Sequence, residues 1–234
     1  MNVQLGVVAD VNTFGKVMAG AWLKRTELAD AGLKLIRRSF FKCKGCGFQS
    51  RPSQQQPAGF MVPFNTNHPA GLVINENHGT CLCPFCASAF AANWSVVPPK
   101  SNKVEMPAPG QLIYLPHMSQ AQVNLLALHV ISVLSSRKIS TQTKAEAIAV
   151  NIDSTMKSLS KDLPAALPIF RDGHDEAFAR ALALLPQEFY EQRSDILSPV
   201  RWWPNASYWR VEGVYWMQST FCAMQNKHPG LGGN

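Results

Sequence analysis

The chain has 234 residues, of which 46% are hydrophobic and 16% are charged, and its formal net charge at pH 7 is +7. This is enough apolar material for one sizeable core, or for one domain with a small satellite, and the aromatic content argues against global disorder. The N-terminus lacks the pattern of a signal peptide, and no stretch of about 18 uncharged apolar residues is present. We therefore expect a cytoplasmic protein with no direct membrane insertion.

The first 97 residues alternate short apolar runs with polar turns. Predicted elements here are a strand at Val3–Asp10, a helix at Lys24–Phe41, a hairpin of residues 60–64 with Leu72–Ile74, and a helix at residues 84–94. The helix from Lys24 follows from apolar residues at helical spacing, and the hairpin follows from short apolar runs bounded by turn residues. This region is predicted to fold as one unit.

A segment rich in Pro, Lys and Ser follows at residues 98–110 and is predicted to be a linker. Residues 111–116 read as a strand. Ser119 and Gln122 then form a capping box, which predicts a helix that begins there and runs to about Ser136. His129 falls within the apolar pattern of this helix and is expected to be a core or rim histidine rather than a ligand.

The rest of the chain is predicted to be mainly helical. Thr143 and Glu146 form a second capping box, and residues 175–185 form a further helix that ends at Pro186. The final residues are polar and glycine-rich and are predicted to be disordered. The predicted organisation is therefore an N-terminal region, a linker, a mainly helical region and a tail, at residues 1–97, 98–110, 111–225 and 226–234.

Tryptophan and tyrosine are concentrated in residues 201–216. One interpretation is that this segment packs onto the body of the protein. The other is a partner-binding face, since these residue types are common anchors at interfaces.

Two C-x-x-C pairs contain four of the six cysteines, namely Cys43, Cys46, Cys83 and Cys86. Four thiolates are the usual closed ligand set of one structural Zn²⁺ ion, and clustered cysteines in a reducing compartment favour metal over disulfides. The 36 residues between the pairs are tolerable because loop-closure entropy grows slowly with length. A redox thiol pair and an iron–sulfur cluster are the alternatives, and Cys81 is interpreted as a spare thiol.

The order of knuckle, hairpin and knuckle on a helix resembles the treble clef of HNH nucleases. Such enzymes carry a histidine directly after the last C-x-x-C, where this chain has Ala87. His68 and His78 lie in the hairpin region, within turn-like runs that also contain asparagines. A metal-dependent HNH-type endonuclease, or a DNA-binding protein attracted by the basic charge, is therefore the alternative function.

The stretches "CKGCGFQS", "CPFCASAF" and "GQLIYLPHMSQAQVNLLALHVI" together resemble the IcmJ/DotN family of type IVB secretion and I-type conjugation systems. The similarity covers about Leu33 to Leu134. It implies an α+β fold, with an HNH-like treble-clef zinc domain followed by a mainly helical C-terminal half, and no catalysis. It further implies a cytoplasmic adaptor peripheral to the inner-membrane secretion complex. Such an adaptor would bind the coupling ATPase (TraD/DotL-type) and other coupling-complex subunits and would assist substrate recruitment, with nucleic acid as a further candidate partner.

Overall fold

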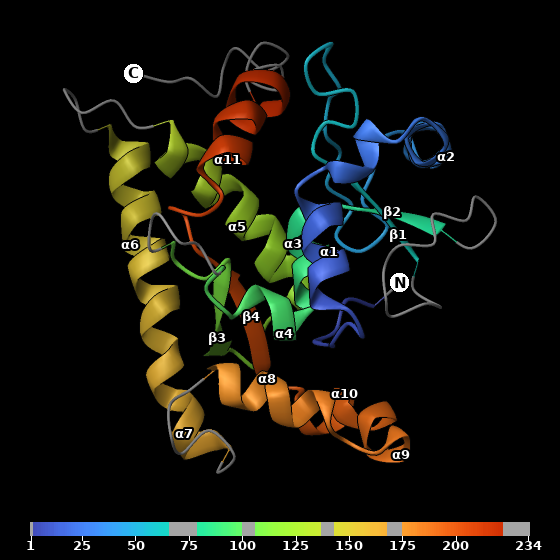
Figure 1. The fold of residues 1–234 in the computed structure, drawn as a ribbon. Helices are drawn as coiled ribbons and strands as arrows, with labels where there is room; N and C mark the ends of the chain where they lie inside the picture. The colour runs from blue at the N-terminus through green and yellow to red at the C-terminus, as the bar shows by residue number, and fades with distance from the viewer. Residues whose placement is uncertain (1, 66–78, 100–105, 137–142, 168–174, 222–234) are drawn as a thin grey trace.

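The computed structural model describes residues 2–65, 79–99, 106–136, 143–167 and 175–221 (Figure 1). The elements before residue 100 are α1 (Val11–Met18), the 3₁₀ helix η1 (Ala21–Lys24), α2 (Thr26–Arg38), β1 (Val62–Asn65), β2 (Gly79–Leu82), α3 (Pro84–Ala89) and α4 (Ala92–Ser95). After residue 105 come β3 (Gly110–Tyr114), α5 (Gln120–Ser135), α6 (Lys144–Ser158), the 3₁₀ helix η2 (Leu159–Asp162) and α7 (Leu163–Ala166). The last elements are α8 (Asp175–Ala183), α9 (Gln187–Glu191), α10 (Arg193–Ile196), β4 (Val200–Pro204), α11 (Arg210–Trp216) and a π-helical turn at Met217–Phe221.

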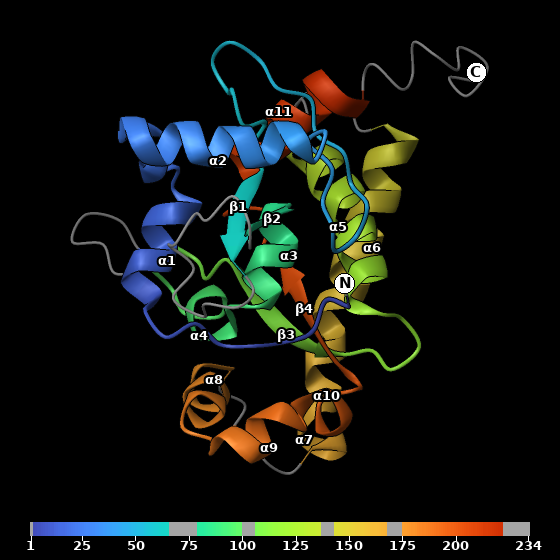
Figure 2. The same cartoon turned by 90° about the vertical axis from the view of Figure 1, so that its right-hand side faces the viewer.

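Helices are combined with two small antiparallel sheets, in agreement with the predicted α+β class. Strand β1 pairs with β2 in a register that sets Val62 opposite Leu82, and β3 pairs with β4 so that Leu112 lies opposite Trp202. Helices α2 and α11 lie at one end of the molecule and α8 to α10 at the other (Figures 1 and 2).

Helix α5 is the central helix and begins where the sequence predicts. Ser119 accepts a hydrogen bond from the backbone of Gln122, whose side chain accepts one from the backbone of Ser119, which completes the predicted capping box. Thr143 and Glu146 form the second box at the start of α6. Both boxes are therefore confirmed.

The predicted hairpin is correct in its first strand. Residues 72–74, which were expected to pair with β1, lie outside the described residues, and the strand that pairs with β1 is Gly79–Leu82. The predicted helix at residues 84–94 consists of two short helices, α3 and α4, which are separated at Phe90 and Ala91. The helix expected to run to Pro186 ends at Ala183.

The prediction of a strand at Val3–Asp10 is wrong. The segment contains no strand, because its backbone groups find partners on helices and side chains instead of a neighbouring strand. Gly6 donates to the Ala89 carbonyl over 3.0 Å and accepts from Ala92 over 2.7 Å. Val8 donates to the side-chain oxygen of Asn93 over 2.9 Å.

The tryptophan-rich segment is part of the core. Trp202, Trp203 and Trp216 are completely buried, and β4 itself was not predicted as a strand. The indole N–H of Trp203 donates to Asp153 over 2.9 Å. For these side chains the packing interpretation is correct and the partner-face interpretation is wrong.

His129 is exposed, not a core residue, and its ring lies 4.4 Å from that of Phe221 between centroids. One hydrophobic cluster includes buried residues from Val3 to Phe221, on both sides of residues 98–110. The division into separate regions at this linker stays a prediction, and residues 226–234 lie outside the described residues. Within the described ranges, no helix combines the length and the apolar character that a membrane span requires.

Candidate metal centre

The first cysteine pair lies on a tight turn between α2 and β1. The backbone N–H of Cys43 donates to the Phe48 carbonyl over 2.7 Å, and the backbone N–H of Gly47 donates to the Cys43 carbonyl over 2.9 Å. Gly47 has a φ of +79°, in the left-handed region that glycine adopts without strain. The backbone N–H of Lys44 donates to the Cys81 carbonyl over 2.9 Å, which fixes the turn against β2.

The second pair lies at the start of α3. Cys83 is the N-cap residue, and its sulfur accepts a hydrogen bond from the backbone N–H of Cys86 over 3.4 Å. Pro84 occupies the first turn, where its missing N–H leaves no donor unsatisfied. This geometry points the Cys83 and Cys86 sulfurs to the same side, and the N-terminal end of a helix favours negative charge.

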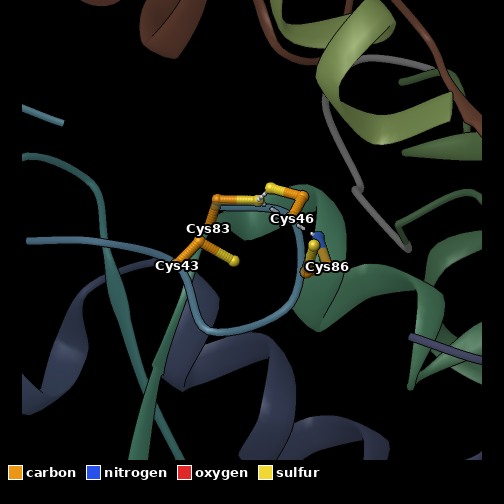
Figure 3. A group of neighbouring side chains, drawn as sticks. All are labelled: Cys43, Cys46, Cys83 and Cys86. Carbon is orange, nitrogen blue, oxygen red and sulfur yellow. Dashed lines mark hydrogen bonds between the residues drawn. The ribbon is translucent and has the colours of Figure 1, made fainter. Parts of the chain in front are cut away.

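The four sulfurs converge on one point (Figure 3). All ligand atoms of Cys43, Cys46, Cys83 and Cys86 lie within 4.8 Å of one another, and the Cys46 and Cys83 sulfurs are 3.7 Å apart. Tetrahedral zinc with Zn–S bonds of about 2.3 Å requires sulfurs about 3.8 Å apart. The four predicted ligands are thus brought together in a group that can hold one metal ion. As whole residues, three of them are buried and Cys46 is partly exposed.

The protonation of this group favours a bound cation. Hydrogen bonds from the other three thiols, Cys46 contributing most, hold the pKa of Cys43 well below its usual range. Burial raises the pKa of Cys83 and of Cys86 well above the thiol range. Four thiolates at this spacing require the charge of a metal ion, because like charges disfavour one another's ionised form.

Cys81 is outside the group, although it is two residues from Cys83. It lies in β2, is buried, and faces Pro63 across the strand pair. Burial, together with the charge of Cys43, raises its pKa well above the thiol range. Cys81 is therefore a neutral thiol and is not among the four converging sulfurs, as the sequence interpretation expects.

A chain of buried amides connects the cysteine group to the second sheet. The Asn124 side chain on α5 donates to the Cys86 sulfur over 3.2 Å. Gln120, one turn earlier, donates to the Asn124 side-chain oxygen over 2.8 Å and also to the Trp202 carbonyl over 2.9 Å. The backbone N–H of Trp202 in turn donates to the Gln120 side-chain oxygen over 2.8 Å. We call these residues, Cys86, Asn124, Gln120 and Trp202, the amide relay.

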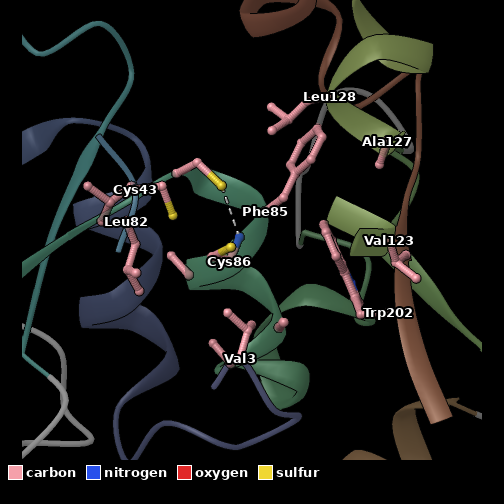
Figure 4. Packing of buried hydrophobic residues seen from close by; sticks show 14 of the residues in the cluster. Val3, Cys43, Leu82, Phe85, Cys86, Val123, Ala127, Leu128 and Trp202 are labelled. Carbon is pink, nitrogen blue, oxygen red and sulfur yellow. Dashed lines mark hydrogen bonds between the residues drawn. The ribbon is translucent and has the colours of Figure 1, made fainter. Parts of the chain in front are cut away.

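Apolar contacts also connect the cysteine group to the tryptophan-rich segment. Phe85, between the two cysteines of the second pair, makes edge contacts with Trp202, Trp209 and Trp216 at centroid distances of 5.9, 5.3 and 5.6 Å. Figure 4 shows Phe85 and Cys86 between two sets of neighbours. Trp202 and the labelled residues of α5 lie on one side, and Cys43 lies on the other. The second cysteine pair is therefore packed between the turn that carries Cys43 and the core formed by α5 and the C-terminal tryptophans.

Sequence reasoning missed Gln120 and Asn124 as residues of the site. Both are buried polar side chains, 3% and 0% exposed, on a helix face whose other buried residues are apolar except Ser132. Two amide residues at i and i+4 within an apolar pattern were the available signal, since buried polar groups need partners. Ala87, which follows Cys86, is buried, while His68 and His78 lie outside the described residues.

Comparison with known protein families and with curated proteins finds no match to this chain. The resemblance drawn from the sequence motifs therefore stays a prediction. Independently of it, the protein brings four cysteines together, able to hold one metal ion, inside a mixed helix and sheet fold.

Proposed function

We propose that the chain is a non-catalytic, zinc-stabilised adaptor of a type IVB secretion or conjugation system. The observation that carries this proposal is the convergence of four cysteine sulfurs within 4.8 Å. Four thiolates are the ligand set typical of structural zinc, and a site with four protein ligands leaves no open position for water or substrate. Zinc in this role contributes directly to the free energy of folding.

The order of elements around the cysteines supports an HNH-like treble clef. A turn with the first pair is followed by the β1–β2 hairpin and then by α3, which carries the second pair at its N-terminal end. In this arrangement the zinc joins the turn to the helix. The proposed role of the metal is therefore to hold the N-terminal half together.

The residue after the second pair supports a role without catalysis. Ala87 occupies the position at which an HNH nuclease carries a histidine, and its methyl group is buried and can bind no ion. Metal-dependent hydrolysis of a phosphodiester needs an ion with open positions that activates water. A sulfur-saturated zinc beside an alanine offers neither.

The proposed partners come from the resemblance and from the position of its motif. Gln120 and Asn124 belong to the stretch "SQAQVNLL", on which the resemblance depends most, and both belong to the amide relay. This gives a physical reason for those residues at that spacing. We accordingly propose that the protein binds the coupling ATPase (TraD/DotL-type) with other coupling-complex subunits, in the cytoplasm at the inner membrane, and assists substrate recruitment.

Two measurements on purified full-length protein test the two parts separately. Elemental analysis is expected to find one zinc per chain, and an absence of metal would overturn the structural-zinc part. Co-elution with the C-terminal region of the coupling ATPase is expected in size-exclusion chromatography. A zinc-loaded, folded protein that fails to co-elute would overturn the adaptor part alone.

The nuclease alternative is tested by incubation with plasmid DNA and Mg²⁺ or Mn²⁺. No cleavage is expected above the level of a metal-chelated control. Cleavage that is lost in both His68→Ala and His78→Ala variants, or in one of them, would replace the adaptor proposal with an HNH-type activity.

A further inference from the structure

A polar cavity of about 320 Å³ is lined in part by Gln120 of the amide relay. It is lined by the N-terminal segment, the start of α5, α10 and the start of β4; Figure 2 shows α10 beneath β4. Its charged lining consists of Arg193, Arg201 and Asp195. The uncharged polar residues of the lining are Asn2, Gln4, Ser119, Gln120, Ser194 and Ser198.

Arg193 is held in one orientation by the protein. Its Nε donates to the Leu5 carbonyl over 3.0 Å, and its Nη1 donates to the Tyr190 carbonyl over 2.7 Å. The guanidinium carbon also lies 4.0 Å from the centroid of the Tyr190 ring, in a cation–π contact. These contacts fix the head group, but no carboxylate of the described residues pairs with its positive charge.

Arg201, the second arginine of the cavity lining, is held in the same manner. Its Nε donates to the Met118 carbonyl, and its Nη1 donates to the carbonyls of Ser198 and Val200 over 2.5 and 2.7 Å. Backbone carbonyls neutralise no charge. Burial lowers the pKa of Arg201 from its usual value, which reports the cost of keeping this cation partly away from water.

Neither guanidinium has a carboxylate within 4 Å among the described residues, in contrast to Lys157, which pairs with Asp153, and Arg180, which pairs with Glu176. Among the described residues, the Nη2 group of each of these two arginines has no hydrogen-bond acceptor. Asp195 lines the cavity too. The two arginines and this aspartate therefore give the described lining one net positive formal charge. Partly buried cations are normally paired, and two in one cavity with a single carboxylate leave room for an anion.

The N-terminal end of α5 adds to this positive field. The helix is 16 residues long, and its capping box satisfies the N–H of Gln122 but not those of Gln120 and Ala121. Orphan N–H groups and the helix dipole make such an end favourable for negative charge. The helix end is therefore a third element, with the two arginines, that favours an anion in the cavity.

We propose that this cavity binds an oxyanion, a phosphate or a carboxylate group, through the guanidinium groups of Arg193 and Arg201. Planar guanidinium groups bind both kinds of anion through paired hydrogen bonds, and prior fixation of the two head groups reduces the entropy lost on binding. An apolar groove of about 160 Å³ shares Arg193 and Leu197 with the cavity. A carboxylate attached to an apolar group therefore fits as well as a free phosphate.

The test uses isothermal titration calorimetry of full-length, zinc-loaded protein in chloride buffer. The two probes are inorganic phosphate and N-acetyl-leucine, which separate a phosphate source from a carboxylate with an apolar side chain. At least one probe is expected to saturate, and the one that binds more tightly identifies the source. If neither saturates at millimolar concentrations, the proposal is overturned.

Substitutions locate the binding. Arg201→Gln is expected to weaken binding about tenfold or more, because a charge-assisted contact is lost. Arg210→Gln is the matched control, since Arg210 is exposed on α11, away from the cavity lining, and the change in net charge is the same. Equal dissociation constants for the two variants would overturn the proposal.

A variant that keeps both arginines makes the test independent of their structural role. Asp195 is exposed, and Asp195→Asn removes a carboxylate from the cavity lining. Binding is expected to tighten roughly threefold because a like charge is removed from the neighbourhood of the anion. An unchanged dissociation constant would mean that the anion binds elsewhere and would overturn the assignment.

Discussion

The cysteine group and the β3–β4 sheet are both buried, but they are stabilised by different forces. The cysteine group consists of ionisable sulfurs from two segments of the chain, and it can hold one metal ion, whose charge would offset that of the thiolates. The sheet carries Trp202 and Trp203, which are completely buried, and depends on apolar area and on a few hydrogen bonds. Chelation and acid should therefore destabilise the cysteine group, and the loss of side-chain volume should destabilise the β3–β4 sheet.

The two regions are nevertheless coupled. Phe85 packs on Trp202, and the amide relay runs from Cys86 through Asn124 and Gln120 to Trp202. Damage to either region should consequently reach the other through these contacts. The following predictions test how far the difference between the two regions holds.

The largest effect is expected for Cys86→Ser. Loss of one thiolate removes the closed ligand set, and we expect the zinc content to fall to near zero and the free energy of unfolding to drop by more than about 4 kcal/mol. Elemental analysis and urea denaturation measure the two quantities. A variant that keeps one zinc and its full stability would show that the sulfurs do not hold the ion.

Cys81→Ala is the matched control, since Cys81 is buried beside the group but is not one of its four sulfurs. It should retain one zinc per chain and lose only about 1–2 kcal/mol, the cost of a small cavity. Loss of zinc here would make Cys81 a ligand.

The next largest effect is expected for Trp202→Ala. The side chain is 0% exposed, and its removal leaves a large cavity, so the free energy of unfolding should fall by about 3–5 kcal/mol. Folded protein should still contain one zinc. Phe189→Ala is the control, because that ring is 50% exposed and should cost less than about 1 kcal/mol. Equal losses in the two variants would contradict the packing described for β4.

Asn124→Ala tests the coupling itself. The change removes the hydrogen bond to the Cys86 sulfur and leaves the buried Gln120 amide without one partner. We expect a loss of about 1–3 kcal/mol in stability and a zinc affinity lower by about 10–100-fold. Chelator competition measures the affinity. Leu125→Ala, the next residue on the same helix and 38% exposed, should leave the affinity unchanged.

Features encoded by neighbouring residues could be predicted from the sequence. The C-x-x-C spacing and the two capping boxes each involve residues three positions apart, so that the pattern itself specifies the local geometry. Val3–Asp10 has the same local pattern as a strand, but a strand needs a neighbour, and this segment binds the helix end at Ala89 instead.

Features that depend on distant partners could not be predicted. β4 pairs with β3, which lies about 90 residues earlier in the chain, and its adjacent Trp202 and Trp203 are both buried. A strand covered on both faces lacks the alternation of polar and apolar residues that identifies strands in a sequence. Asn124 was missed for a similar reason, because its partner Cys86 is 38 residues away.

The smallest effect is expected for Asp175→Asn, which changes the charge beside β3. Asp175 accepts a hydrogen bond from the backbone N–H of Leu112 over 2.7 Å, yet burial raises the pKa of this carboxyl above its usual value. A raised pKa means that the folded state binds the proton more tightly than the unfolded state, so this group lowers stability as pH rises through the carboxyl range. Asparagine keeps an acceptor for Leu112 and removes the charge.

The variant should therefore be more stable than the parent at pH 7, by less than about 1 kcal/mol, and the difference should disappear toward about pH 4, near the unfolded pKa. Urea denaturation of both proteins across this range measures it. Acid also protonates the cysteine thiolates and releases metal, which lowers stability, but both proteins share that loss and it cancels in the difference. If the variant is less stable than the parent at pH 7, the negative charge of Asp175 stabilises the start of α8. The stability of the β3 region would then depend on charged side chains, like that of the cysteine group.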